Sequence, residues 1–334
     1  MIGPKQKETT MELAKILAIP HGLILQALLM LENKTAYWIG HRPKKSGGER
    51  QIQAARQPLN TIQARIAGII SQESVSEISH GFVAGRSHRT AILPHLRANA
   101  FFTFDIKNAF PSTTRKQVQF SLRQVGWKIG FGEEVADLMA ELVCYTPFGK
   151  LEDSFLPLGY TSSPYIFNLV LKDIDRLLLE FAKKRGYQVS RYVDNFAVST
   201  TKKTISERER KTAIKIVESW SLGHYKIPEE KTSYWEVKEG KVLFEFLGLV
   251  IEGTEAGERV INVVDEKLGE CQWIILGALE EEDFSEATLR TIRGKMNYLT
   301  SVYRHQGRPL PAKISELFAK YRAMKNSQAY FKTD

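Results

Sequence analysis

The stretch Arg191–Thr200, RYVDNFAVST, guides the interpretation of the whole chain. Short apolar runs flank the polar pair Asp194-Asn195, and this pattern predicts a tight β-hairpin with the pair at its turn. Such a turn pushes the Asp194 carboxylate out of the sheet, while apolar neighbours shield it from water. A metal-binding carboxylate can be presented in this way, but an ordinary hairpin with a turn-favouring Asp-Asn pair has the same pattern. A second carboxylate in a suitable setting is needed to distinguish the two.

A candidate for that second carboxylate is Asp105, which ends the run FFTFD at 101–105. The residues before it have high β-propensity and predict a buried strand. A strand that ends at Asp105 places the carboxylate at the edge of a sheet. Since Asp105 and Asp194 are far apart in the sequence, only the fold can bring them together.

A basic hairpin is predicted near the N-terminus. Residues 37–54 indicate a strand, the loop PKKSGG at 43–48, and a second strand. The backbone of a Gly-rich loop can approach a phosphate closely, and Lys45 and Arg50 can neutralise its charge. A solvated basic turn is the alternative interpretation.

Residues 155–185 are predicted to form a loop followed by one long helix. The loop LPLGYTSSP contains Gly159, and its end is typical of a helix start, with Ser163 as N-cap and Pro164 at the first helical position. Apolar residues then recur at spacings of three or four up to Phe181, as on one face of a helix.

The region after the Asp194 hairpin contains three further predicted elements. Residues 202–220 indicate a charged amphipathic helix, and residues 223–232 a loop that includes Lys231. The run FEFLGLVI at 244–251 indicates a single strand with a kink at Gly248.

Both ends of the chain are predicted to be helical. Residues 9–33 have helical periodicity that Pro20 breaks into two pieces. Residues 265–334 indicate a small helical domain.

Composition indicates a soluble globular protein of two or three compact units, with 334 residues, 43% apolar and 25% charged. The net charge of +9 favours a polyanionic partner. The isolated Cys144 and Cys271 predict neither a disulfide framework nor a cysteine zinc site. The most apolar window, 14–31, contains Lys15 and Pro20, so we expect no membrane span. We see no secretory leader and expect a cytoplasmic protein.

Taken in chain order, these motifs resemble those of a reverse transcriptase, over roughly residues 35 to 305. FFTFDIKNAF resembles the first catalytic motif of that family, LPLGYTSSPYIFNLVL its template-and-nucleotide helix motif, and RYVDNFAVS its metal-binding hairpin. The bacterial retron enzymes are the most similar subgroup, because HGFVAGRSHRTAILPH, RPKKSGGERQI and IRGKMNYLTSVY are retron-like. Ala91 and Ile92 depart from the retron Asn-Ala, and FLGLVIEG replaces the retron-typical Val-Thr-Gly with a general primer-grip pattern. Other defence-associated or group II intron-like reverse transcriptases are therefore alternatives.

The resemblance implies an α+β right-hand polymerase. Residues 1–98 are expected to form N-terminal helices and fingers, and residues 99–253 a palm with inserted finger elements, whose antiparallel sheet packs on helices. Residues 254–334 are expected to form a helical thumb.

The resemblance also implies a two-metal site, with two Mg²⁺ ions that Mn²⁺ can replace. Asp105 and Asp194 are the expected bridging ligands, and the Ile106 carbonyl and Asn195 are the expected additional ligands. The family usually has a second Asp where this chain has Asn195, so we expect weaker metal affinity.

Several residues match the family's nucleotide contacts. Phe110 matches the steric gate that crowds a ribose 2′-OH, although a core Phe is equally consistent with its place. Leu158 replaces the family's usual Gln. The other predicted dNTP contacts are Lys45, Arg50, Gly159 and Lys231, the last a candidate proton donor to pyrophosphate or a solvated loop Lys.

The primer and template contacts are also expected from the resemblance. Tyr192 and Val193 match residues under the primer end, and Leu247 and Gly248 match the primer grip.

The implied activity is RNA-directed DNA synthesis on a cognate structured noncoding RNA, primed by a guanosine 2′-OH to give a branched RNA–DNA hybrid (msDNA). The implied partners are that RNA, its DNA product, dNTPs and a separately encoded effector protein of anti-phage defence, without a membrane. Asn195 and Leu158 motivate an alternative of another class, a weakly catalytic RNA-binding scaffold with a polymerase fold.

Overall fold

The computed structural model describes residues 3–43, 47–147, 150–238, 242–254 and 256–330. The chain divides into two compact units. The first unit comprises Met1–Ser87, Thr103–Val198 and Ser206–Ser233; the second comprises His88–Phe102, Ser199–Ile205 and Tyr234–Asp334.

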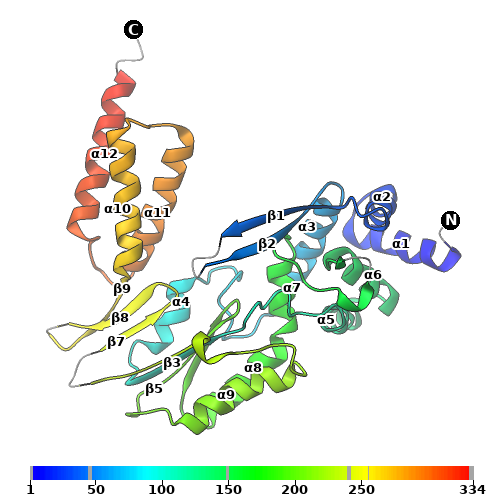
Figure 1. The fold of residues 1–334 in the computed structure, drawn as a ribbon, viewed down its shortest axis with the longest axis horizontal. Coiled ribbons are helices and arrows are strands. Elements are labelled where there is room, and N and C mark those ends of the chain that lie inside the picture. Colours follow the sequence, from blue (N-terminus) through cyan, green and yellow to red (C-terminus); the bar gives the residue numbers. More distant parts are fainter. Residues whose placement is uncertain (1–2, 44–46, 148–149, 239–241, 255, 331–334) are drawn as a thin grey trace. The chain divides into compact units, whose positions relative to one another are not determined.

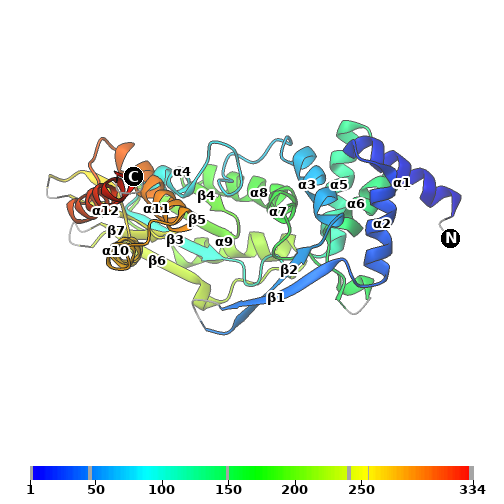
Figure 2. The same ribbon diagram turned by 90° about the horizontal axis from the view of Figure 1, so that it is seen from above.

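Helices from separate parts of the sequence pack together in the first unit (Figure 2). They are α1 (Pro4–Leu17), α2 (His21–Glu32), α3 (Leu59–Ile70), α5 (Arg115–Ile129) and α6 (Glu133–Val143). The predicted break at Pro20 is confirmed, and Ala18 closes α1 in a left-handed conformation. Sequence analysis missed α5 and α6, although Thr114 and Gln117 form a capping box whose pattern was visible.

The basic hairpin is confirmed as β1 (Tyr37–Pro43) and β2 (Glu49–Ala55), an antiparallel pair in which Arg42 lies opposite Arg50. The predicted contact Lys45, at the tip, lies outside the described residues.

A four-stranded sheet has the strand order β4-β5-β3-β6. Its strands are β3 (Ala100–Asp105), β4 (Gln188–Tyr192), β5 (Asn195–Thr200) and β6 (Thr232–Glu236). Phe104 and Phe196 are buried on it and stack with ring centroids 5.0 Å apart. Helix α8 (Lys172–Lys183) packs against β4, and α9 (Glu207–Trp220) lies beside α8 (Figure 1).

The predicted long helix after Gly159 is two helices. α7 (Ser163–Val170) and α8 are separated at Leu171. Ser162, not Ser163, is the N-cap of α7, and its side chain makes no capping hydrogen bond. Helix α9 begins at Glu207 instead of near residue 202, because Ser206 and Glu209 form a capping box there.

The second unit has a three-stranded sheet of β7 (Leu243–Phe246), β8 (Leu249–Gly253) and β9 (Arg259–Val263). The predicted single kinked strand at 244–251 is therefore wrong, since β7 and β8 form an antiparallel hairpin. Leu247 and Gly248 both have positive φ, +59° and +72°, as a two-residue turn of the favoured type requires.

The C-terminal helices of the second unit form a bundle (Figure 1). They are α10 (Asp265–Glu280), α11 (Glu286–Arg304) and α12 (Ala312–Tyr330), and the short helical segments α4 (His88–Ile92) and η1 (Leu93–His95) also belong to this unit. Ile292, Met296 and Leu299 on α11 are buried, and Leu289 on the same apolar stripe is partly buried. The predicted mixture of helices and antiparallel strands is confirmed.

The two cysteines are both buried, Cys144 after α6 and Cys271 within α10. Burial raises the pKa of the Cys144 thiol to about 12 and also raises that of Cys271. No single helix in the described part of the chain is long and apolar enough to cross a membrane. Among the described residues, the helix pair α1 and α2 is long and apolar enough when taken together, but it is bent by 119°.

Candidate active site

The turn between β4 and β5 consists of Val193 and Asp194, so the predicted turn is one residue off and Asn195 begins β5. Val193 has φ +59°, an uncommon conformation for a β-branched residue. The Ile106 N–H donates a hydrogen bond to the Asp194 carbonyl oxygen at 3.2 Å, which joins the turn to the end of β3. The fold therefore brings Asp105 and Asp194 to one place.

The Asp194 carboxyl is half-buried, and its surroundings oppose its ionisation. Burial raises its pKa, and the nearby Asp105 carboxylate raises it further. Lys231 and Arg50 lower the pKa in part. A carboxyl group whose ionisation is opposed by burial and by a neighbouring carboxylate is suited to binding a cation.

The Asp105 carboxylate has one paired and one unpaired oxygen. Its Oδ2 accepts a hydrogen bond from Lys231 Nζ at 2.9 Å, whereas Oδ1 is buried and has no hydrogen-bond partner in the described structure. A buried carboxylate oxygen without a partner is costly unless a ligand satisfies it, and a hard cation does so. The structure thus places Lys231 beside the acidic pair.

Asn195 donates a hydrogen bond from Nδ2 to Asp194 Oδ1 at 3.0 Å. Its amide therefore acts first as a donor that orients the carboxylate. Its expected role as a metal ligand, like that of the Ile106 carbonyl, stays a prediction. Among the described residues, no group of three or more His, Cys, Asp or Glu side chains is placed to hold a metal ion.

Phe110, the predicted gate, is partly exposed and stacks on the buried Phe167 with ring centroids 4.9 Å apart. One face of its ring thus packs against the core. Both of its predicted roles, core residue and gate, are compatible with this position.

Gly159 has a packing reason to be glycine. Its φ is +100°, and an added Cβ would lie 2.5 Å from Ile52 Cγ2 and 2.7 Å from the Gln53 carbonyl oxygen. The Gln53 N–H donates to the Leu158 carbonyl oxygen at 2.8 Å. The loop is thereby fixed to β2, the strand that carries the exposed Arg50, and its contact with a nucleotide stays a prediction.

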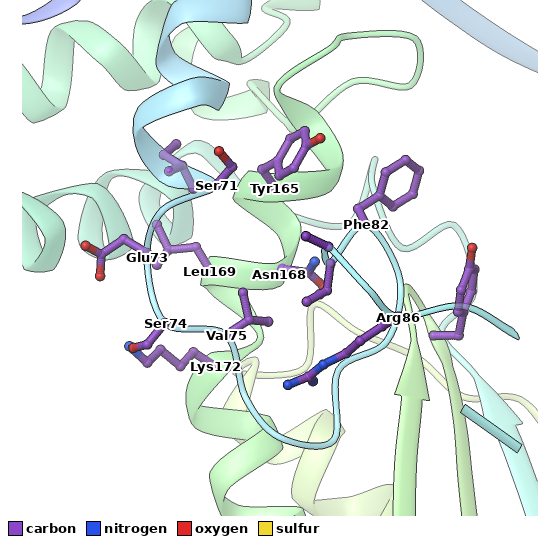
Figure 3. Close-up of a pocket in the computed structure, with 14 residues that line it drawn as sticks. Ser71, Glu73, Ser74, Val75, Phe82, Arg86, Tyr165, Asn168, Leu169 and Lys172 are labelled. Atoms are coloured by element: carbon purple, nitrogen blue, oxygen red, sulfur yellow. The ribbon is translucent and has the colours of Figure 1, made fainter. Parts of the chain in front are cut away.

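A pocket of about 720 Å³ lies in the first unit (Figure 3). Segment 70–86, helices α7 and α8, and Tyr192 line it. Phe82 and Tyr165 meet edge to face with centroids 6.3 Å apart, and Lys172 contacts Ser74. Sequence analysis noted both the HGFVAGRS loop and the helix motif but did not predict that they share a pocket.

Leu247 and Gly248 form the β7–β8 turn of the second unit. Lys267 Nζ donates to the Leu247 carbonyl oxygen at 2.8 Å, and an added Cβ at Gly248 would meet the Lys267 side chain. Their contact with a primer stays a prediction, as do those of Tyr192 and Val193.

Comparison with known proteins identifies the family. The family described as reverse transcriptase (RNA-dependent DNA polymerase) matches residues 42–251. The chain belongs to the reverse transcriptase family. The predicted right-hand polymerase fold is thereby confirmed, and reverse transcriptases use divalent metal ions, which the buried unpaired oxygen of Asp105 fits.

Several curated relatives of the chain are retron enzymes. Retron Mx65 reverse transcriptase of Myxococcus xanthus is 32% identical over 57% of this chain and 46% of its own length. Retron Mx162 reverse transcriptase of the same organism is 33% identical over 48% of this chain and 35% of its own length. Retron Ec86 reverse transcriptase of Escherichia coli is 26% identical over 83% of this chain and 80% of its own length. The matches thus span less than half the length of the two M. xanthus relatives. The predicted resemblance to retron-type enzymes is confirmed.

Proposed function

We propose that this protein is an RNA-directed DNA polymerase that copies a structured noncoding RNA into DNA. The observation that supports this most is the meeting of Asp105 and Asp194, with Asp105 Oδ1 buried and unpaired, in a chain of the reverse transcriptase family. The cognate RNA, msDNA synthesis, a separately encoded effector and a role in anti-phage defence belong to the same proposal, on the strength of the retron relatives.

Asp105 and Asp194 would hold two divalent ions, with the Ile106 carbonyl and Asn195 as further oxygen ligands. When bound, such ions activate the primer hydroxyl and stabilise the charge of the leaving pyrophosphate. Carboxylate, carbonyl and amide oxygens favour Mg²⁺, and Mn²⁺ accepts the same ligands.

The chain's own cations have complementary roles. Arg50, whose charge lowers the pKa of Asp194 in part, would bind the triphosphate of a dNTP through its guanidinium. Lys231 Nζ, next to Asp105, holds a proton for the leaving pyrophosphate. Phe110 would exclude a ribose 2′-OH, and the pocket beside Tyr192 would take part in binding the template and primer.

Primer extension tests the proposal. The purified protein should extend a DNA primer on an RNA template with dNTPs in Mg²⁺, and also in Mn²⁺. Absence of extension by folded protein in both metals would instead support the RNA-binding scaffold, for which Asn195 and Leu158 are the motivating residues. Sequencing of the nucleic acid that co-purifies with the protein identifies its RNA.

Asn195→Asp should lower the Mg²⁺ concentration for half-maximal extension by roughly threefold to tenfold, about 1 kcal/mol, because it adds a negative charge beside two dications. The change also removes the Nδ2 hydrogen bond to Asp194, which limits the gain. A Mg²⁺ titration of both proteins measures the shift.

The matched control is Asn33→Asp, which adds the same charge at an exposed position after α2. The Mg²⁺ requirement of Asn33→Asp should equal that of the wild type. If the Mg²⁺ requirement of Asn195→Asp is unchanged or higher, the hydrogen bond donated by the amide contributes more to metal binding than an added charge would.

A further inference from the structure

A buried charge lies directly behind the acidic turn. Arg191, in β4, has no exposed surface and forms a bidentate ion pair with the equally buried Asp175 of α8. Its Nε and Nη2 donate to Asp175 Oδ1 and Oδ2, both at 2.7 Å. Sequence analysis included Arg191 in the hairpin motif but gave it no role.

The third nitrogen of Arg191 reaches the turn itself. Its Nη1 donates to the Val193 carbonyl oxygen at 2.8 Å and to Asn168 Oδ1 at 3.0 Å. Val193 immediately precedes Asp194 and has positive φ. A hydrogen bond to its carbonyl therefore holds the peptide plane that precedes Asp194 in this uncommon conformation.

Asn168 connects the Arg191 guanidinium to the loop beside the pocket. Its Oδ1 also accepts a hydrogen bond from Ser79 Oγ at 3.1 Å, and its Nδ2 donates to the Gly81 carbonyl oxygen at 2.8 Å. Gly81 in turn lies against the turn, since an added Cβ would be 2.6 Å from Val193 Cγ2 and 2.8 Å from the Val193 nitrogen. Figure 3 shows Asn168 at the pocket wall, on the helix that faces this loop.

A contribution to stability alone is a weak explanation for the buried Arg191–Asp175 ion pair. Two buried charges lose their hydration, and a well-packed apolar pair in their place is often as stable or more so. A buried ion pair is better explained where it fixes one geometry. Here that geometry is the backbone of Val193 and Asp194.

We infer that Arg191 and Asn168 are positioning residues for Asp194: together with Asp175 they hold the turn so that its carboxylate and Asp105 bind the metal ions in productive geometry. This inference rests on the proposed function for its catalytic part. Metal binding by the isolated protein tests it independently.

The decisive variant is the double substitution Arg191→Met/Asp175→Leu, which removes both charges and leaves neither buried alone. We expect its thermal midpoint to stay within a few degrees of the wild type. We expect its Mn²⁺ dissociation constant, measured by electron paramagnetic resonance without nucleic acid or dNTP, to rise about tenfold. In primer extension, kcat should fall on the order of a hundredfold because the carboxylate is misplaced, while KM for dNTP changes less than about threefold.

The control is Arg123→Met/Asp137→Leu. Arg123 of α5 and Asp137 of α6 also form a bidentate pair, at 3.0 and 2.7 Å, but it is partly exposed and does not touch the turn. Wild-type Mn²⁺ affinity and kcat are expected for it.

If the first double variant does not fold, the Mn²⁺ affinity of Arg191→Lys tests the inference. The lysine keeps the positive charge, but its single nitrogen cannot reach Asp175, Asn168 and Val193 together. Normal Mn²⁺ affinity in whichever folded Arg191 variant is measured would overturn the inference. If the wild-type protein binds Mn²⁺ but extends no primer, the proposed function fails, and the Mn²⁺ comparison still decides the positioning role.

Discussion

Asp105→Asn and Asp194→Asn should each reduce primer extension by about a thousandfold or more, because bound metal ions contribute several kcal/mol of transition-state stabilisation. Either substitution keeps the size of the side chain but removes the charge of a proposed metal ligand and replaces one acceptor oxygen with an NH2 donor. The rate of single-nucleotide addition at saturating Mg²⁺ measures the effect.

Folding should survive these substitutions. Asp105 raises the pKa of Asp194, so removing one charge of the pair relieves an unfavourable interaction in the folded state. The ion pair with Lys231 is lost in Asp105→Asn, but this pair is partly exposed and contributes little. The thermal midpoint should therefore stay the same or rise.

The surface control is Asp173→Asn on α8, whose carboxylate is partly exposed and pairs only weakly with Arg176 at 3.6 Å. Extension at a wild-type rate by either active-site variant would reject the metal-ligand assignment.

Phe110→Ala should raise the incorporation of rNTP relative to dNTP by roughly tenfold or more, since the ring that would crowd the 2′-OH is removed. The stacked Phe167 stays in the core, so the substitution should open space mainly where the Phe110 ring lay. Competition between matched rNTP and dNTP in single-nucleotide assays gives the ratio.

The corresponding control is Phe120→Ala, at an exposed position on α5. If Phe110→Ala lowers the thermal midpoint but leaves the ratio unchanged, Phe110 is a core residue and the discrimination lies elsewhere.

Local sequence patterns predicted the elements that present the acidic pair. The run before Asp105 is a buried strand, and the run around Asp194 is a hairpin, because strand propensity and turn chemistry are encoded over a few residues. Even there, the turn is displaced by one residue, because Val193 and Asp194 form it and Val193 adopts the positive φ.

Interactions between distant residues could not be predicted in the same way. The Arg191–Asp175 pair joins a strand to a helix, and Asn168 adds a loop that precedes both in the chain. No spacing rule connects such residues. Gly159 illustrates a related limit, because the residue type indicated a close approach but not that the neighbour would be Ile52.

The burial of the two cysteines provides a means of measuring motion. Cys144 belongs to the first unit and Cys271 to the second, so each unit contains one protected thiol. A thiol reagent can modify either residue only after the surrounding structure opens, and modification rates then report the free energy of local opening. Mass spectrometry of the two labelled peptides would thus measure the local opening of each unit separately in the unaltered protein, with and without added RNA.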